Sequence, residues 1–153
     1  MNKEGLIKKL IEEDGFFKHN NYEVVEATEE ACILKAKVTK NSLNPYGIAH
    51  GGFIFGLGDT VLGMASSVHG RPAVTLSSTI NFLRPAKTEY IIAKAELVKE
   101  GKTTSYLQAK IYDDKDKLIA SMDANYYYID LKEGQLWQIE NYLKKQKNIL
   151  VKK

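Results

Sequence analysis

The feature that most constrains this sequence is a continuous apolar segment between residues 51 and 68. Its apolar residues fall on every side of a helix: Phe53, Ile54, Phe55, Leu57, Val61, Leu62, Met64, Ala65 and Val68. A helix that is apolar all round must be buried all round. The segment also holds Gly56, Gly58 and Gly63, and each glycine costs about 1 kcal/mol relative to alanine in a helix interior. We therefore expect another backbone, from a sheet or from a partner helix, to approach this helix closely.

Segments of alternating hydrophobicity on both sides of this helix predict the sheet that buries it. Strands are expected near residues 22–27 and 32–38, and four longer strands follow the helix. Their inward faces are predicted to be Val74, Leu76, Ser78, Ile80 and Phe82; Ile91, Ala93, Ala95 and Leu97; Leu107, Ala109 and Ile111; and Leu118, Ala120, Met122, Ala124, Tyr126 and Tyr128. Short turns make neighbouring strands antiparallel. The sequence therefore predicts an α+β fold, a curved antiparallel sheet wrapped around one long central helix. An open sheet edge could pair with a second copy to form a dimer.

The two ends of the chain each predict a flanking helix. Apolar residues recur at helical spacing from about residue 3 to 14, and again from about 135 to 150. With a core over about 20–131, the 153 residues are expected to form a single domain.

Charge and cysteine content exclude several classes of protein. The net charge of +3, from 22 basic against 19 acidic residues, is too small to indicate nucleic-acid binding. No apolar run is expected to span a bilayer, and the charged N-terminus argues against a signal peptide. The single cysteine, Cys32, cannot form an internal disulfide and is expected to be a buried structural thiol. We expect a cytoplasmic protein that binds neither membrane nor nucleic acid.

Asp59 is the only charged residue between His50 and His69, inside the apolar helix. A buried carboxylate is costly unless it is paired or hydrogen-bonded, so its presence needs a reason. It could be structural, capping a neighbouring element or pairing with a lysine. It could also be a general base or nucleophile in a mostly dry site.

The start of the same helix offers a second chemical group. The sequence His50-Gly51-Gly52 places two glycines where backbone N–H groups have no partner within the helix. Such donors can hold a developing oxyanion, although paired glycines also occur in ordinary tight turns. Eight residues separate Gly51 from Asp59, about 12 Å along a helix axis. Groups serving one carbonyl should lie within about 7 Å of each other. Two antiparallel helices from a dimer would meet this condition, giving two equivalent sites.

These residues resemble the PaaI-like group of hotdog-fold thioesterases. The resemblance rests on Asn44, on His50-Gly51-Gly52 with an acid nine residues after the histidine, on Val74-Thr75, and on Asn81-Phe82-Leu83-Arg84-Pro85. It runs from about residue 15 to 130. It implies a hotdog fold, a homodimer that often pairs into a homotetramer, and hydrolysis of acyl-CoA without a metal or cofactor.

The resemblance also implies roles for individual residues. Asp59 matches the catalytic acid, Gly51 the oxyanion donor, Asn44 the orienting amide and His50 the histidine at the helix start. Relatives often carry serine or threonine one turn after the acid, where this chain has Gly63. The hydroxyl is therefore either missing or supplied by another residue; the candidates are Thr60, Ser66 and Ser77.

Several further expectations concern the substrate. We expect it to contact Gly52, Phe55, Gly63, Ser77, Ser78 and Arg84. Arg84 could meet a CoA phosphate or could be a solvated surface residue. Ser77 and Ser78 lack the Gly-x-Ser-x-Gly sequence of a serine hydrolase, so a nucleophilic serine is rejected. Two other functions stay open: a non-catalytic acyl-CoA sensor, and hydration of an enoyl-CoA, which would need a histidine near Asp59. The acyl group itself cannot be read from the sequence.

Overall fold

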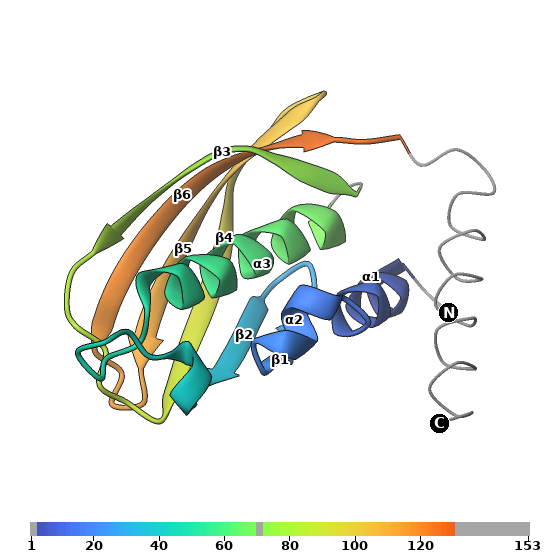
Figure 1. Cartoon of the computed structure of the whole chain (residues 1–153). Coiled ribbons are helices and arrows are strands. Elements are labelled where there is room, and N and C mark those ends of the chain that lie inside the picture. Colours follow the sequence, from blue (N-terminus) through green and yellow to red (C-terminus); the bar gives the residue numbers. More distant parts are fainter. Residues whose placement is uncertain (1–2, 70–71, 131–153) are drawn as a thin grey trace, which may run out of the picture.

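A computed structural model of the chain describes residues 3–69 and 72–130, and these residues form one antiparallel sheet with helices packed against it (Figure 1). The strands are β1 (Tyr22–Ala27), β2 (Cys32–Lys37), β3 (Ala73–Phe82), β4 (Tyr90–Glu100), β5 (Thr104–Asp113) and β6 (Leu118–Tyr128). The helices are α1 (Lys3–Glu12), α2 (Gly15–His19), the short 3₁₀ helix η1 (Lys40–Ser42) and α3 (Gly51–His69). The strand order is β1-β2-β4-β5-β6-β3. The predicted α+β architecture is confirmed.

The sheet curves around α3, which forms the centre of the core (Figure 1). The inward residues of the strands alternate with outward ones, as their hydrophobic pattern predicts; those fully buried include Leu34, Ala36, Ile91, Ala93, Leu107, Ile111, Ala120 and Met122. On the side away from the sheet, α1 packs against α3 and α2 packs against β1 (Figure 1). The helix is thus covered by the sheet on one side and partly by the N-terminal helices on the other.

The N-terminal segment is two helices rather than the single one predicted over residues 3–14. Asp14 has an extended backbone, and its Oδ1 accepts hydrogen bonds from the amides of Phe16 (2.7 Å) and Phe17 (3.2 Å). This is an N-cap, and it favours a new helix over continuation of the first. The C-terminal helix predicted over 135–150 lies outside the described residues.

Within the described chain, side chains and not another backbone approach Gly56, Gly58 and Gly63, and the close approach of a partner helix stays a prediction. A Cβ added at Gly56 would lie 2.8 Å from the ring of Phe16 and from the Tyr22 hydroxyl. At Gly58 it would lie 2.6 Å from the sulfur of Met122. Large residues of the sheet and of α2 therefore occupy the space that a side chain of α3 would need.

The helix α3 also corrects the expectation that no segment could span a membrane. Among the described residues, Gly51–Val68 has the length and apolar composition of a spanning helix. Most of this segment is buried inside the fold, as in the core helix of a soluble protein.

The edge strand β3 departs from its predicted pattern. The register of β3 against β6 shifts between Thr75 and Ser77, which marks a β-bulge at Leu76. Between Ser78 and Phe82, the residues predicted to face inward pair with buried residues of β6. On the other side of the bulge, Val74 pairs with the exposed Tyr127. The inward assignment of Val74 and Leu76 is therefore wrong, because one extra residue in a strand reverses the alternation.

Candidate active site

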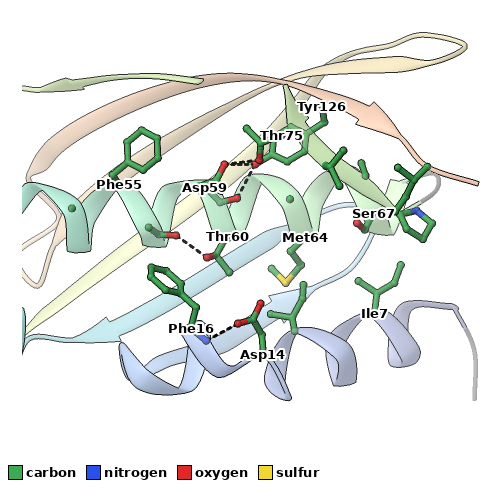
Figure 2. A pocket seen from close by; sticks show the side chains of 18 residues that line it. Ile7, Asp14, Phe16, Phe55, Asp59, Thr60, Met64, Ser67, Thr75 and Tyr126 are labelled. Carbon is green, nitrogen blue, oxygen red and sulfur yellow. Dashed lines mark hydrogen bonds between the residues drawn. The ribbon is translucent and has the colours of Figure 1, made fainter. Parts of the chain in front are cut away.

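The Asp59 carboxylate is held by two hydroxyl groups. The Thr75 hydroxyl donates to Asp59 Oδ1 at 2.9 Å, and the Tyr126 hydroxyl lies 2.8 Å from the same oxygen (Figure 2). The Tyr126 hydroxyl is also 2.8 Å from the backbone carbonyl oxygen of Asp59. The side chain is half-buried rather than fully buried as expected from the sequence. The acid is thus neither isolated nor part of an ion pair among the described residues.

The β3–β6 pairing explains why these two hydroxyls meet at Asp59. Thr75 and Tyr126 are register partners on neighbouring strands, and the bulge at Leu76 immediately follows Thr75. A bulge of this kind re-aims the side chains next to it. It places Thr75 on the same face of the sheet as the buried Tyr126, which faces α3.

The three hydroxyls that the sequence offered bond to other groups and make no hydrogen bond to Asp59 in the described part of the chain; a contact from one of them to the reacting water stays a prediction. Thr60 donates to the carbonyl of Gly56 at 2.7 Å, within its own helix. Ser66 is buried 2.9 Å from Ser105. Ser77 accepts a hydrogen bond from the amide of Asn125 at 3.3 Å.

Tyr126 is a permanent hydroxyl donor. Burial raises the pKa of the phenol far above its ordinary value, and the neighbouring Asp59 charge acts in the same direction. The phenol therefore stays protonated at neutral pH. Its single hydrogen serves Oδ1 or the carbonyl oxygen of Asp59, and in either case the ring and hydroxyl fix the position of the acid.

A cavity of about 710 Å³ opens beside Asp59, between α3, the N-terminal helices and β3 (Figure 2). Most of its lining is apolar: Ile7, Ile11, Phe16, Phe55, Met64, Pro72, Ala73, Val74 and Ile129. The predicted substrate contacts Gly52, Phe55 and Gly63 lie on its wall. Ser77 and Ser78 do not, and their predicted role stays a prediction. No lysine or arginine among the described residues lines this cavity.

The two glycines at the start of α3 differ in whether their backbone N–H groups are hydrogen-bonded. His50 caps the helix: its Nδ1 accepts a hydrogen bond from the amide of Gly52 at 2.9 Å, and its carbonyl accepts from Phe53 and Ile54. No hydrogen bond within the described part of the chain uses the N–H of Gly51. Gly51 therefore presents the free amide, in the place where the helix dipole favours negative charge.

Asn44 shapes the loop in front of this helix. Its Oδ1 accepts hydrogen bonds from the amides of Tyr46 (2.9 Å) and Ile48 (3.3 Å), and Gly47 completes the turn with a φ of 73°. A second cavity, of about 280 Å³, brings Asn44, Gly51 and Arg84 together. Because Oδ1 is committed to the loop, the side-chain NH₂ of Asn44 is the group left to face a ligand.

Arg84 lies on the rim of this second cavity. One guanidinium nitrogen donates to the carbonyl of Leu118 at 2.8 Å, and the side chain is exposed. The remaining N–H groups of the guanidinium point to solvent or to a ligand.

The other candidate residues have structural explanations. Cys32 is buried, and burial raises its pKa to about 12, so its thiol is not a nucleophile at neutral pH. Tyr126 and Tyr128 are buried whereas Tyr127 is exposed, which confirms the predicted alternation. The sequence missed Thr75 and Tyr126 as partners of the acid. The only sequence signal for this pair is that Val74-Thr75 belongs to the motifs that resemble PaaI-like thioesterases, and this signal concerns Thr75 alone.

The two chemical groups thus occupy separate places in one chain. Asp59 lines the larger cavity, whereas Gly51 lines the smaller one, two turns nearer the start of α3. No described cavity contains both. The fold and this pair of half-sites define a class of protein with an acid on a central helix and an amide donor at the helix start.

Comparisons with known proteins agree with this class. Residues 46–120 match the model of the thioesterase superfamily. The acyl-coenzyme A thioesterase PaaI of Escherichia coli K12 is 30% identical over 112 residues, which cover 72% of this chain and 80% of that protein. The structure of the E. coli PaaI protein has a TM-score of 0.77 at 25% identity, covering 84% of this chain and 97% of the other. A Streptococcus mutans protein bound to acetyl CoA has a TM-score of 0.68 at 31% identity, covering 71% and 89%.

The chain belongs to the PaaI-like family of hotdog-fold thioesterases. It is accordingly a thioester hydrolase, and its fold is the hotdog fold that the resemblance implied.

Proposed function

We propose that this thioesterase hydrolyses acyl-CoA at two equivalent sites of a homodimer. The E. coli relative is named for this activity, and a similar structure holds acetyl CoA. We place the reaction in the cytoplasm, where a free thiol such as that of Cys32 stays reduced. Pairing of two dimers into a tetramer stays a prediction.

The separation of the two half-sites along α3 carries this proposal. Asp59 and Gly51 are eight residues apart in one helix, about 12 Å along its axis. Two antiparallel copies of α3 would bring Gly51 of the partner subunit opposite Asp59. Each subunit then contributes an acid to one site and an amide to the other.

The edge strand β3 supports the same assembly. It ends the sheet, so one side of its backbone has no strand partner within the described chain. Its side chains Leu76 and Phe82, and Leu83 just after it, are each more than half exposed. A long apolar edge is an aggregation hazard unless it is covered, and pairing with β3 of a second copy covers it.

The chemistry follows from the oxygen of Asp59 that the hydroxyls leave open. Thr75 and Tyr126 engage Oδ1, so Oδ2 is the oxygen available for reaction. Asp59 Oδ2 either accepts a proton from water as that water attacks the thioester carbon, or attacks the carbon itself to form a mixed anhydride that water then cleaves. In both routes Gly51 of the partner subunit donates its N–H to the oxyanion, the C–S bond breaks, and CoA leaves as the thiolate.

Asn44 and His50 support this reaction from the start of α3. The free NH₂ of Asn44, in the cavity of Gly51, orients the water or the carboxylate. His50 holds the helix start through its Nδ1, so we assign it to positioning the amides rather than to proton transfer. The same cap disfavours hydration of an enoyl-CoA, which needs a histidine beside the acid.

The lining of the larger cavity indicates the kind of acyl group. It is apolar and, in the described residues, holds no cation that could neutralise a second carboxylate. The carboxylate of Asp14, also on the wall, is occupied by the cap of α2. We therefore propose an uncharged, apolar acyl group that extends from Asp59 toward α1, and not a dicarboxylic one.

Subunit complementation tests the shared site directly. Asp59→Asn removes the acid, and Gly51→Pro removes the amide hydrogen. We expect each homodimer to be nearly inactive. A heterodimer with one change in each subunit, isolated through two affinity tags, should recover about half of wild-type activity because one of its two sites is intact.

The matched control places both changes in one subunit beside an unaltered partner. Each shared site then carries one defect, so this heterodimer should be nearly inactive. A site made within one chain predicts the opposite pattern: activity in the control and none in the first heterodimer. That pattern would overturn the proposal.

A further inference from the structure

We propose that Tyr126 is a positioning residue for the reaction, which holds Oδ1 of Asp59 so that Oδ2 faces the thioester. The inference rests on the proposed catalytic role of Asp59. Tyr126 lies on β6 and reaches the acid from the sheet, whereas the other residues with a proposed role in the reaction lie on α3 or in the loop before it.

The contact is anchored at both ends of the tyrosine. The side chain is only 2% exposed, so the ring has a single place to lie between β6 and α3. Its hydroxyl is 2.8 Å from both Oδ1 and the carbonyl oxygen of Asp59. Two oxygens of one residue therefore converge on one phenol, which fixes the side chain of the acid relative to its own backbone.

Thr75 reaches the same carboxylate oxygen and not the other one. Its hydroxyl donates to Oδ1 at 2.9 Å, and no hydrogen bond within the described part of the chain reaches Oδ2. The two neighbours on β3 and β6 thus lie against one oxygen, on the side of the sheet. The carboxylate is oriented, and its second oxygen keeps its lone pairs for water or for the thioester carbon.

Gly63 makes room for this arrangement. It lies one turn after Asp59, where the resemblance to PaaI-like thioesterases leads one to expect serine or threonine. A Cβ at Gly63 would lie 3.5 Å from the Tyr126 ring and 3.7 Å from its hydroxyl, which is ordinary contact. A hydroxyl beyond that Cβ would bond back to the carbonyl of Asp59, the oxygen that Tyr126 already contacts. The tyrosine therefore stands in for the absent hydroxyl.

The first test is Tyr126→Phe, which removes one oxygen from a buried ring. We expect kcat to fall about tenfold with KM within about twofold, because the acid is displaced while the cavity is kept. The control is Tyr128→Phe, a buried phenol on the same strand whose hydroxyl lies near Glu100 instead. It should leave both quantities unchanged.

The second test separates the two oxygens that Tyr126 contacts. In the Tyr126→Phe background, the hydroxyl that Gly63→Ser adds would bond back to the carbonyl of Asp59 and not to Oδ1, so neither Gly63→Ser nor Gly63→Ala should restore kcat. Recovery with Gly63→Ser alone would overturn the role of the Oδ1 contact. If Tyr126→Phe does not fold into the wild-type assembly, difluorotyrosine at position 126 keeps the ring and makes the hydroxyl a stronger donor. The value of kcat should then change by more than about twofold with KM unchanged.

The outcomes separate this inference from the proposed function. A folded Tyr126→Phe protein with wild-type kcat, or a difluorotyrosine protein with wild-type kcat, overturns the role of Tyr126. If Asp59→Asn abolishes turnover in the same assays, the proposed function is kept and only the role of Tyr126 is lost. If Asp59→Asn is active, both fail.

Discussion

The two halves of the site are built by different means. At the start of α3, the reactive group is a backbone amide, and its place is set by the cap of His50 and the loop turn around Asn44. In the middle of α3, the reactive group is a carboxylate set by side chains of two strands, Thr75 and Tyr126. The first half depends on local sequence and the second on long-range register. The two halves should therefore respond differently to substitution.

The largest effect should come from the carboxylate half. Asp59→Asn keeps the shape of the side chain and an oxygen that can accept from Thr75 and Tyr126, but it removes the charge. We expect kcat to fall by about 10³-fold or more, because both proposed routes need a carboxylate oxygen. The melting temperature and the assembly should be unchanged. A thiol-release assay over a panel of acyl-CoA thioesters measures this.

The matched control for that substitution is Thr60→Val. Thr60 is the next residue of α3 and lines the same cavity, but its hydroxyl bonds to Gly56 and not to Asp59. It should keep kcat within about threefold of wild type. Wild-type turnover in Asp59→Asn would show that the acid has no catalytic role.

The amide half should give a smaller but still large effect. Gly51 is the first residue of α3, a position that proline tolerates because its N–H has no partner in the helix. His50 is the capping residue, and the extended backbone typical of a capping residue is compatible with a proline at the next position. Gly51→Pro should therefore remove one oxyanion donor without breaking the helix, and lower kcat by about 10²-fold.

Gly51→Ala separates the lost hydrogen from the added carbon. A Cβ added at Gly51 would lie 3.2 Å from the ring of Phe82, and both variants add this Cβ. Only alanine keeps the N–H. We expect Gly51→Ala to retain most of its activity. Equal losses in the two variants would mean that the contact with Phe82, and not the amide, is responsible.

The same contrast explains how much of the molecule the sequence predicts. The six strands, the central helix and its buried core follow from period-two and all-round apolar patterns, which are local. The isolated charge of Asp59 and the Gly51-Gly52 pair are visible for the same reason. The cap by His50 and the loop of Asn44 also depend on neighbours in sequence.

The features of the site that the sequence missed depend on strand register. Thr75 and Tyr126 come from strands far apart in the chain, and only the order β6-β3 makes them neighbours. The bulge at Leu76 has no side-chain signature, yet it shifts the alternation by one residue. Val74 and Leu76 were therefore expected on the inner face, and Thr75 was not. A one-residue slip exchanges the two faces of a strand, and hydrophobicity alone does not reveal it.

The smallest expected effect concerns binding at the amide half. Arg84 shares a cavity with Gly51 and keeps free N–H groups, so we expect it to meet a phosphate of CoA. Arg84→Met should raise KM for an acyl-CoA about tenfold and leave kcat nearly unchanged. KM for the same acyl group on N-acetylcysteamine, which has no phosphate, should stay within about twofold.

The two substrates separate recognition of CoA from damage to the fold. Losing the bond from Arg84 to the carbonyl of Leu118 could loosen the turn before β6, but that would raise KM for both substrates alike. Lys87→Met is the control, because Lys87 is exposed near the same end of the sheet and lines neither cavity. If it raises KM for acyl-CoA as much as Arg84→Met does, the attraction comes from general positive charge. A selective loss in Arg84→Met would instead fix the direction of the substrate, with CoA at the start of α3 and the acyl group toward α1.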